Sequence, residues 1–496
     1  MDDPASQVIG RLRERGVIAG SLATDSRALA AGEVFLAYPG GQADGRRYIP
    51  QALARGAAAV LWEREGFAWD PAWQVPNMPV DNLRNLAGPL ASRLSGEPSA
   101  RLRVIAVTGT NGKTSCSQWI AQALQARGAA CGVVGTLGMG LAGGALAPNP
   151  NTTPDPVLLQ RALRDMADAG AVACAMEASS IGLDQGRLNG TLVRTALYTN
   201  LSRDHLDYHG DMERYAAAKR RLFELPGLEN AVLNMDDPQG VMLAQSLAGR
   251  GVARWGYALH EGAAARAGLE HWVEAGPIAY RGAVMSFEAR GSSGTVSIQS
   301  PVLGRFNAAN LLGVYCVLLA EGCSPEDAAA RLANLSPVPG RMHCLGGDGQ
   351  PLVVVDYAHT PDALDKVLES LAEVARSRGG RLAVVFGCGG DRDPGKRALM
   401  GAIAGRRAGR IMLTSDNPRS EDPDAIISAI SAGVGVAHEV QPDRALAIRQ
   451  VVASAAAQDV VLLAGKGHEA WQEAAGVRTP FSDAGHARLA LEARAR

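Results

Sequence analysis

An apolar run that ends in a glycine-rich turn constrains the fold of this chain more than any other feature of its sequence. The run spans 104–108, and the turn after it reads Gly109-Thr110-Asn111-Gly112-Lys113-Thr114-Ser115. In a phosphate cradle of this kind, glycines let backbone N–H groups point at an anion, the lysine reaches the terminal phosphates, and the threonine hydroxyl binds Mg²⁺. The sequence therefore predicts an α/β domain that binds ATP through all seven residues of the turn.

The cradle departs from the usual P-loop pattern at one position. Val107 stands where that pattern has its first glycine, so the loop has the shorter GxxGKT form. A purely structural junction of strand, turn and helix is the alternative. The apolar strand that the motif requires does precede the turn, and this favours phosphate binding.

Composition limits the class of protein. A chain of 496 residues is too long for one core, and at roughly 150 residues per domain it predicts three domains. The net charge of -1 gives no electrostatic footprint for nucleic acid or an anionic membrane. The acidic start and the lack of any apolar run of about 18 residues predict a cytoplasmic protein without membrane insertion. The seven cysteines never show CxxC spacing, which argues against disulfides and zinc.

Two stretches rich in proline, glycine and serine suggest domain boundaries, at 95–99 and at 335–340. We predict a small N-terminal α/β substrate domain at 1–97, a central P-loop ATPase domain at 98–336, and a C-terminal domain at 337–496. The apolar runs 172–176 and 231–234 alternate with helical patterns, which indicates a mostly parallel central sheet.

After the second boundary, four apolar runs are separated by segments of helical length. They predict a doubly wound, Rossmann-like C-terminal domain, and they are 352–355, 382–386, 411–413 and 460–463. The glycines at 387–390 follow the second of these runs but do not match GxGxxG. A dinucleotide site is therefore not predicted.

Carboxylates and histidines gather after the central strands. Glu177 follows the run 172–176, at a strand end where open α/β sheets bind ligands, and it suits a metal ion. His205 and His209 stand four residues apart and could be read as a zinc site, but neither Cys nor HExxH supports zinc, and Mg²⁺ prefers oxygen ligands. A loop of solvated charge is a further alternative. Taken alone, Lys219 would be a solvent-facing helix lysine.

Six motifs together resemble the Mur ligases of peptidoglycan synthesis. They occur in order as 108–114 (TGTNGKT), 176–180 (MEASS), 200–207 (NLSRDHLD), 218–219 (AK), 304–310 (GRFNAAN) and 356–361 (DYAHTP). The similarity extends over nearly the whole chain. It implies an ATP-dependent, ADP-forming acid–amino-acid ligase that phosphorylates a carboxylate and lets an amine attack the resulting acyl phosphate.

The resemblance also implies roles for residues around the cradle. Lys113, Glu177, His205 and Lys219 match the family's catalytic positions. Within the family, Thr114 and Glu177 serve a first Mg²⁺ ion and His205 a second. Lys219 matches the lysine that becomes carbamylated (N6-carboxylysine), which converts a cation into an oxygen donor for the metal. The two ions and Lys113 would offset the repulsion between phosphate and carboxylate.

Further positions match substrate contacts of the family. Residues that hold adenine, ribose or phosphate are matched by Asn310, Arg341, Asp356 and His359. Contacts to UDP in the N-terminal domain are matched by Ser26, Gln42 and Ala43, and contacts to the muramoyl dipeptide by Thr152, Thr153, Ser179, Gln185 and Arg187. For these two sets, ordinary capping and turn chemistry is the alternative. A hinge at 336–340 that closes the site over its substrates is a further hypothesis.

Two motifs of the C-terminal domain, 416–419 (DNPR) and 465–469 (GKGHE), resemble those of the family branch that adds meso-diaminopimelate to UDP-N-acetylmuramoyl-L-alanyl-D-glutamate. The acceptor-binding residues expected from them are Arg392, Asp416, Asn417, Pro418, Arg419, Gly465 and Glu469. Diaminopimelate differs from lysine by a carboxylate, which the planar fork of Arg419 can bind, while Glu469 suits an ammonium. The alternative is that 416–419 merely turns the chain after a strand.

Several rival functions remain open from the sequence. The same type of ligase could accept L-lysine or another amino acid, or catalyse the following D-alanyl-D-alanine addition. Folate polyglutamate synthesis uses a similar cradle and lysine, but an N-terminal domain of this size argues against it. A P-loop switch or motor ATPase is a rival from another class. The expected partners are the two substrates alone, without nucleic acid, and the expected state is a monomer.

Overall fold

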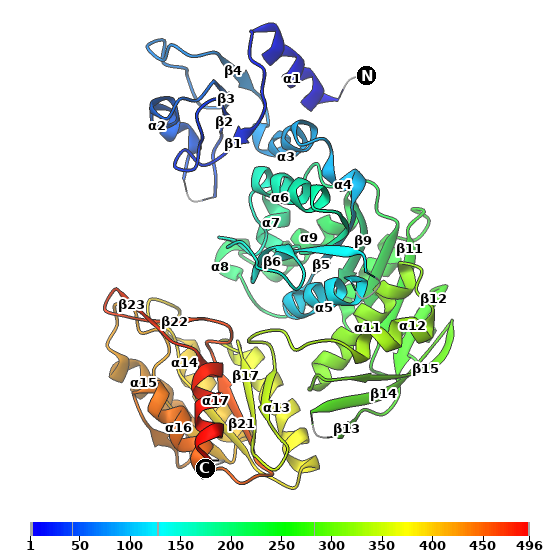
Figure 1. Ribbon diagram of the computed structural model, residues 1–496, viewed down its shortest axis with the longest axis vertical. Helices are drawn as coiled ribbons and strands as arrows, with labels where there is room; N and C mark the ends of the chain where they lie inside the picture. Colours follow the sequence, from blue (N-terminus) through cyan, green and yellow to red (C-terminus); the bar gives the residue numbers. More distant parts are fainter. Residues whose placement is uncertain (1–2, 42, 126–127, 282, 495–496) are drawn as a thin grey trace. The chain divides into compact units, whose positions relative to one another are not determined.

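The computed structural model describes residues 3–41, 43–125, 128–281 and 283–494. Its internal contacts divide the chain into two compact units (Figure 1). The first unit runs to Glu274 and includes Gly291–Ser293 and Leu312–Ala328. The second holds Ala275–Arg290, Gly294–Leu311 and the chain from Ala329 onward. The finer boundaries at 97/98 and 336/337 stay predictions. No helix among the described residues is long and apolar enough to cross a membrane.

The first unit begins with a small sheet of four parallel strands in the order β1-β2-β3-β4. The strands are β1 (Leu22–Ala23), β2 (Val34–Ala37), β3 (Ala59–Glu63) and β4 (Asn77–Val80). The helices are α1 (Pro4–Glu14), η1 (Gly45–Tyr48), α2 (Ile49–Ala54) and α3 (Leu83–Leu94). Because successive side chains of a strand face opposite ways, β2 contributes to two apolar clusters, with Val34 in one and Phe35 in the other.

The predicted linker at 95–99 is shorter than expected, because Pro98 begins helix α4 (Pro98–Arg101) and is buried with Ser99. The Ser99 hydroxyl accepts a hydrogen bond from the Leu192 N–H at 3.0 Å. In α3, a side chain at Gly88 would clash with the carbonyl of Asn189. The small sheet's last helix is therefore packed directly against the part of the unit that follows.

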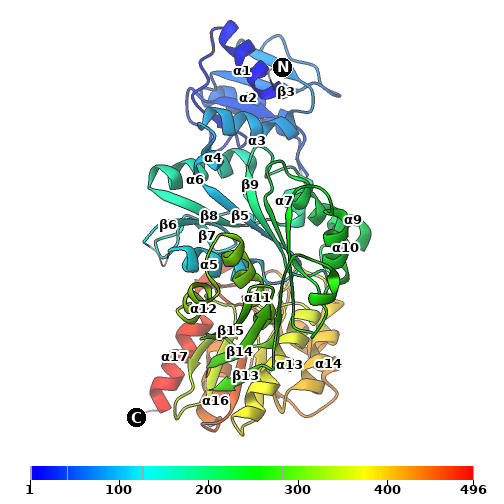
Figure 2. The same ribbon diagram turned by 90° about the vertical axis from the view of Figure 1, so that its right-hand side faces the viewer.

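The larger sheet of the first unit has the order β12-β11-β10-β9-β5-β8-β6-β7, and only β7 is antiparallel to its neighbour in this order. Figure 2 shows β5 between β8 and β9. The bounds are β5 (Arg103–Thr108), β6 (Ala130–Gly135), β7 (Gly138–Leu141), β8 (Ala171–Glu177), β9 (Val193–Tyr198), β10 (Asn230–Asn234), β11 (Ala253–Ala258) and β12 (His271–Ala275). The predicted strands at 172–176 and 231–234 are confirmed. Since the chain continues from β8 across β5 to β9, the strand order reverses at β5, where such sheets bind ligands.

Helices flank this sheet, and the cradle helix α5 (Lys113–Gln125) follows β5 directly. The others in chain order are α6 (Pro156–Asp168), α7 (Ser180–Asp184), α8 (Leu206–His209), α9 (Met212–Arg220), η2 (Arg221–Glu224), α10 (Pro238–Ser246), η3 (Ala265–Ala267), α11 (Arg305–Ala320) and α12 (Pro325–Ala333). Asp155 begins α6 by accepting hydrogen bonds from the N–H groups of Val157 and Leu158. The same carboxylate accepts from the Thr24 hydroxyl at 3.0 Å, which ties the small sheet to α6.

The second unit contains three antiparallel strands that the sequence did not predict. They are β13 (Ala279–Arg281), β14 (Val284–Gly291) and β15 (Gly294–Ser300), with β14 paired to both neighbours. Burial alternates along β14, with Met285, Phe287 and Ala289 buried. This period of two is the mark of a sheet with one exposed face.

The main sheet of the second unit has the order β16-β17-β21-β18-β19-β20, parallel except for β16. The strands are β16 (His343–Gly346), β17 (Leu352–Asp356), β18 (Leu382–Phe386), β19 (Arg410–Leu413), β20 (Glu439–Val440) and β21 (Val460–Ala464), followed by the hairpin β22 (Trp471–Ala474) and β23 (Val477–Pro480). The helices are α13 (Pro361–Ser377), α14 (Lys396–Arg407), α15 (Pro423–Val434), α16 (Arg444–Ser454) and α17 (Asp483–Arg494). All four predicted strands and the Rossmann-like layout are confirmed.

Candidate active site

The turn after β5 has the backbone geometry of an anion cradle. Gly109 and Gly112 have φ angles of +150° and +89°, which side-chain-bearing residues rarely adopt. A side chain at Gly109 would also clash with the hydroxyl of Thr199. The Lys113 ammonium folds back over the turn and donates to the carbonyl oxygens of Gly109 and Thr110 at 2.8 and 2.9 Å. The Lys113 side chain is thus hydrogen-bonded across the turn that precedes α5.

Asn200, which follows β9, fixes the tip of this loop. Its carbonyl accepts from the Thr110 N–H at 2.8 Å, and its side-chain oxygen accepts from the Asn111 N–H at 3.0 Å. Its amide group donates back to the Asn111 carbonyl at 3.1 Å. The motif at 200–207 contained this residue, but nothing in its spacing indicated a structural role, because the contact joins segments about 90 residues apart.

Glu177 ends β8 with its carboxylate buried beside the cradle. Its Oε2 accepts from the Thr114 hydroxyl at 3.0 Å, and its Oε1 from the Thr136 N–H at 2.7 Å. A side chain at Gly135 would clash with this carboxylate, so the glycine keeps the space around it open. A buried carboxylate next to a threonine hydroxyl at a helix start is a donor set that fits Mg²⁺, which favours oxygen ligands.

Lys219 of α9 is buried, with 1% of its surface exposed, so the alternative of a solvent-facing lysine is wrong. Its ammonium donates to the Gly109 carbonyl at 2.8 Å, the same oxygen that Lys113 contacts. It also lies 4.3 Å from the centre of the Tyr215 ring. Burial, reinforced by the charge of Lys113, holds the pKa of Lys219 well below its ordinary value. Burial therefore favours the neutral amine of this side chain over its charged form.

His205 and His209 do not face one another as a metal pair. His205 is half-exposed near Asp204, and burial lowers its pKa. The Nε2 atom of His209 lies 3.0 Å from the Ser180 hydroxyl, inside the protein. The described residues contain no group of three or more His, Cys, Asp or Glu side chains that could hold a metal ion. The zinc alternative therefore finds no support, whereas His205 remains accessible beside the cradle.

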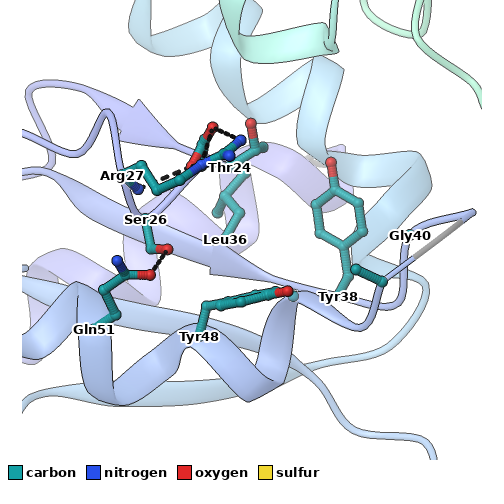
Figure 3. A pocket seen from close by; sticks show the side chains of 11 residues that line it. Thr24, Ser26, Arg27, Leu36, Tyr38, Gly40, Tyr48 and Gln51 are labelled. Carbon is teal, nitrogen blue, oxygen red and sulfur yellow. Dashed lines mark hydrogen bonds and ion pairs between the residues drawn. The ribbon is translucent and has the colours of Figure 1, made fainter. Parts of the chain in front are cut away.

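A pocket of about 370 Å³ lies in the small sheet's domain (Figure 3). Ser26 and Ala43 line it, as does Tyr38, whose ring stands on one side of the hollow, while Tyr48 lies across its floor. The Ser26 hydroxyl donates to the side-chain oxygen of Gln51 at 2.7 Å. Of the three predicted UDP contacts, Ser26 and Ala43 therefore share one pocket, and Gln42 lies outside the described residues.

The residues predicted to contact the muramoyl dipeptide form a second group. The Thr153 hydroxyl accepts from the Ser179 N–H at 2.9 Å and donates to the Glu177 carbonyl, also at 2.9 Å. Arg187 donates to the Thr153 carbonyl at 2.7 Å and to the Gln185 side chain. The Thr152 hydroxyl lies 3.2 Å from that of Thr136, the residue that binds Glu177. The structure thus brings this predicted set together next to the cradle.

The two predicted substrate groups also meet. A Cβ atom at Gly41, in the loop that carries Ala43, would lie 2.9 Å from the amide nitrogen of Gln185. The pocket of the small sheet and the residues around Thr153 are therefore neighbours within the first unit.

The predicted adenine, ribose and phosphate contacts outside the cradle all belong to the second unit. Asp356 ends β17 and is buried, where it accepts from the N–H groups of Met342 and Ala358 at 2.8 and 2.9 Å. Burial raises the pKa of this carboxyl. The others in the second unit are Asn310, Arg341 and His359.

Three loops converge beyond the carboxyl ends of β18, β19 and β21. Arg419 adopts the left-handed conformation at φ +53°, and its NH1 donates to the Gly390 carbonyl at 2.6 Å. A Cβ atom at Gly389 would lie 2.9 Å from this guanidinium and 3.9 Å from the Arg392 side chain. A side chain at Gly465, where φ is +111°, would clash with the Asp416 carboxylate. The predicted acceptor residues are therefore brought together at one end of the sheet.

The hairpin β22–β23 fixes the backbone of this cluster. The Arg419 N–H donates to the Glu473 carbonyl at 3.1 Å, and the Arg419 carbonyl accepts from the Ala475 N–H at 2.6 Å. Asn417 donates to the Glu469 carboxylate at 2.8 Å. Lys466, to which the sequence assigned no role, lies fully buried beside these two residues.

Three family models match the chain. The Mur ligase family catalytic domain matches residues 20–94, the Mur ligase middle domain 107–318, and the Mur ligase glutamate ligase domain 340–467. A UDP-N-acetylmuramoyl-L-alanyl-D-glutamate–2,6-diaminopimelate ligase of Ralstonia nicotianae is 50% identical over 495 residues, which cover 98% of this chain and 96% of the relative. The chain belongs to the Mur ligase family. The family consists of ATP-dependent ligases, and the chain is an enzyme of this class.

Solved structures agree with the family. A UDP-N-acetylmuramoyl-L-alanyl-D-glutamate–2,6-diaminopimelate ligase is 38% identical, with a TM-score of 0.71 over 96% of both chains. A Mycobacterium tuberculosis folylpolyglutamate synthase complexed with ADP and AMPPCP, at 18% identity, shares the fold with a TM-score of 0.59 over 77% of this chain and 92% of its own. The three-domain α/β architecture of the Mur ligases, predicted from the sequence, is thereby confirmed.

Proposed function

We propose that this Mur ligase joins meso-diaminopimelate to the D-glutamate side-chain carboxylate of UDP-N-acetylmuramoyl-L-alanyl-D-glutamate and converts ATP to ADP and phosphate. The meeting of the 387–390, 416–419 and 465–469 loops at one sheet end is the observation that carries the proposal. This end is where a doubly wound sheet binds ligands, and two arginines lie there beside one glycine loop. The identity to diaminopimelate ligases supports the same substrates.

The acceptor differs from lysine by a second carboxylate, and Arg419 is the residue that we assign to it. In the described part of the chain, the guanidinium is tied only through NH1, so Nε and NH2 can form a bidentate pair with a carboxylate. Lysine would leave this partly buried group unpaired, and sites built around a polar group reject analogues that lack it by about 10⁴-fold. Arg392 and the 416–418 and 465–469 segments complete the acceptor site.

We assign the ATP phosphates to the 109–115 turn, with Lys113 on the terminal phosphates and Asn310, Arg341, Asp356 and His359 on the rest of the nucleotide. The open backbone of the turn supports this assignment. Thr114 and Glu177 would hold one Mg²⁺ ion, and His205 and Lys219 the second. When bound, Mg²⁺ supplies positive charge where two anions must approach each other.

Lys219 is proposed to serve as a carbamate. Its neutral amine would add CO₂ and lose a proton, which gives a carboxylate-like group with oxygens for Mg²⁺. Two observations support this: the side chain is buried beside another lysine, and its pKa is held well below the ordinary value. An unmodified ammonium at this position could not bind a metal ion.

For the nucleotide-sugar peptide we propose two adjoining subsites. Ser26 and Ala43 take the UDP portion in the pocket of Figure 3, and Gln42, which lies outside the described residues, is proposed as a third UDP contact. The muramoyl dipeptide lies along Thr152, Thr153, Ser179, Gln185 and Arg187. The contact between Gly41 and Gln185 supports a continuous path between them. The Thr153 hydroxyl donates to the backbone carbonyl of Glu177, which connects the dipeptide subsite to the residue proposed to bind Mg²⁺.

We further propose a cytoplasmic monomer that acts without nucleic acid or membrane insertion. The net charge of -1 supports the absence of a nucleic-acid partner. The seven cysteines are free thiols in the structure, as is usual for proteins of a reducing compartment.

An acceptor exchange tests the proposal. Purified protein with the UDP-N-acetylmuramoyl dipeptide, ATP and Mg²⁺ should release phosphate rapidly with meso-diaminopimelate and scarcely with L-lysine or D-alanyl-D-alanine. A preference for either alternative would reject the assignment. Phosphate release that is equally fast without any nucleotide-sugar peptide would instead favour a P-loop switch or motor ATPase.

A further inference from the structure

Lys466, in the turn after β21, is turned into the protein. None of its surface is exposed, and its ammonium donates to Asn417 Oδ1 at 2.8 Å and to Glu469 Oε2 at 3.2 Å. The rings of Trp471 and Phe481 lie 5.7 and 5.9 Å from Nζ. Lysine is almost never fully buried unless its charge is paired. Lys466 is therefore a buried cation that contacts Asn417 and Glu469, two residues of the proposed acceptor site.

The ammonium of Lys466 determines which way the Asn417 side chain points. Asn417 Oδ1 accepts from Lys466 and also from the Glu473 N–H at 3.0 Å. With two donors on the oxygen, the amide nitrogen must face the other way, and it donates to Glu469 Oε2 at 2.8 Å. The side chains of Lys466, Asn417 and Glu469 thus form a triangle of three hydrogen bonds, between Lys466 and Asn417, between Asn417 and Glu469, and between Lys466 and Glu469.

The two oxygens of Glu469 are used differently. Oε2 accepts from both Asn417 and Lys466, whereas no described residue hydrogen-bonds Oε1. The side chain is 18% exposed, so the carboxylate lies at the edge of the buried triangle. An anionic oxygen with its lone pairs open is a strong acceptor for an ammonium group.

We propose that Lys466 is a positioning residue for the acceptor amino acid: it clamps Asn417 and Oε2 of Glu469 so that Oε1 faces the acceptor's ammonium group. This inference rests on the proposed function. A lysine in an amino-acid site would ordinarily be assigned to the substrate's carboxylate. The burial of Nζ against Asn417 and Glu469 argues against that role here and leaves the carboxylates to the arginines.

The arrangement also explains why an amide or an apolar side chain would not replace Lys466. Without the cation, Asn417 could rotate and donate elsewhere, and Glu469 would keep a partly buried charge with one fewer partner. The carboxylate would then turn toward solvent, away from the acceptor. ATP and the nucleotide-sugar peptide make no use of this triangle, so their binding should be unaffected.

The test is a double-mutant cycle of Lys466→Met and Glu469→Gln, with steady-state kinetics for each substrate. We expect Lys466→Met to raise KM for meso-diaminopimelate by about 10- to 100-fold, because removing one partner of a buried charged pair weakens binding strongly. KM for ATP should stay within about twofold, because the effect is confined to the acceptor site. Glu469→Gln should raise the same KM. In the Glu469→Gln background, Lys466→Met should add little, because Lys466 acts through Glu469.

Lys366→Met is the matched control, since Lys366 pairs with Asp362 on the exposed face of α13. It should leave every KM unchanged. An unchanged acceptor KM in Lys466→Met, or an equal increase in both backgrounds, would overturn the inference. If Lys466→Met alone does not fold, the double variant, in which neither side chain is charged, is compared with Glu469→Gln. The two should then have similar KM values for the acceptor. Should the wild-type protein prefer L-lysine, the proposed function fails, and the cycle is run with lysine, whose ammonium tests Lys466 equally.

Discussion

At the scale of single residues, Glu177 is the side chain on which metal binding should depend most. Replacing it with Gln keeps the hydrogen bonds to Thr114 and Thr136 possible but removes the charge. We expect the Mg²⁺ concentration for half-maximal activity to rise by about 10- to 100-fold, which is the usual loss of affinity when a residue that supports a metal site is replaced. A titration of activity with Mg²⁺ measures the effect.

Glu274→Gln is the control for this experiment. Glu274 is also a buried carboxylate, but it accepts hydrogen bonds from the backbone N–H groups of Gly262, Ala264 and Ala265. Its replacement should lower thermal stability without changing the Mg²⁺ dependence. If the two variants show the same Mg²⁺ dependence, Glu177 does not bind the metal ion.

Lys219 should make the protein less stable than it could be. A lysine with a lowered pKa in the folded state binds fewer protons there than in the unfolded chain, so stability rises with pH between the folded pKa and the ordinary value of 10.5. In CO₂-free buffer at neutral pH, Lys219→Met should raise the free energy of unfolding by about 1–3 kcal/mol, because the buried amine has one carbonyl partner and, in the described part of the chain, no hydrogen-bonded carboxylate to compensate its burial. Denaturant unfolding measures the gain, which should shrink as the pH rises toward 10.

The same position separates stability from activity. Lys219→Met should be inactive, and Lys219→Ala, which leaves room, should be inactive but partly restored by short carboxylic acids that replace the carbamate. Equal activity of the Ala variant would remove Lys219 from the mechanism. A Met variant less stable than the wild type at neutral pH would show that the ammonium is better accommodated than its burial implies.

The roles of these residues were visible in the sequence only in part. The motif around Lys219 predicted its importance by resemblance, whereas taken alone it looked like a surface lysine on a helix. Its burial follows from how α9 packs, which no local pattern encodes. Lys466 stands between Gly465 and Glu469, two predicted acceptor residues, and its role was still missed, because its partner Asn417 is 49 residues away in the chain.

At the scale of elements, the hairpin β22–β23 carries the backbone that fixes Arg419. Its two-residue turn has Ala475 and Gly476 at φ +50° and +76°, as in a type I′ turn. Ala475→Gly should therefore stabilise the protein and Gly476→Ala should destabilise it, each by about 1 kcal/mol, because only glycine adopts such angles without strain. Paired melting curves measure both. Shifts in the same direction would mean that strain in this turn does not control stability.

The elements that the sequence predicted well are the buried parallel strands. Runs such as 352–355 and 460–463 are apolar on every residue because helices cover both faces of the sheet. Strands β13 to β15 escaped prediction for the opposite reason. Ser286 and Glu288 stand between the buried residues Met285, Phe287 and Ala289 of β14, so no continuous apolar run marks this strand.

At the scale of the whole molecule, the residues proposed for ATP are divided between the two compact units. The 109–115 turn belongs to the first, and Arg341, Asp356 and His359 belong to the second, while Asn310, also in the second, lies on α11, whose residues from Leu312 onward belong to the first unit. One nucleotide can contact both sets only if the units are brought to a defined arrangement. The sequence predicted the residues but not this arrangement, because domain placement depends on weak interfaces and on ligands rather than on local patterns.

We therefore expect substrates to change the dimensions of the protein. An acyl phosphate must be shielded from water, and domain closure is a common way to exclude it. The radius of gyration from small-angle scattering should fall when a non-hydrolysable ATP analogue and both other substrates are added together, and less with the analogue alone. In Lys113→Met, which should hold the terminal phosphates poorly, the change should be reduced. Identical scattering with and without the full set of substrates would contradict closure.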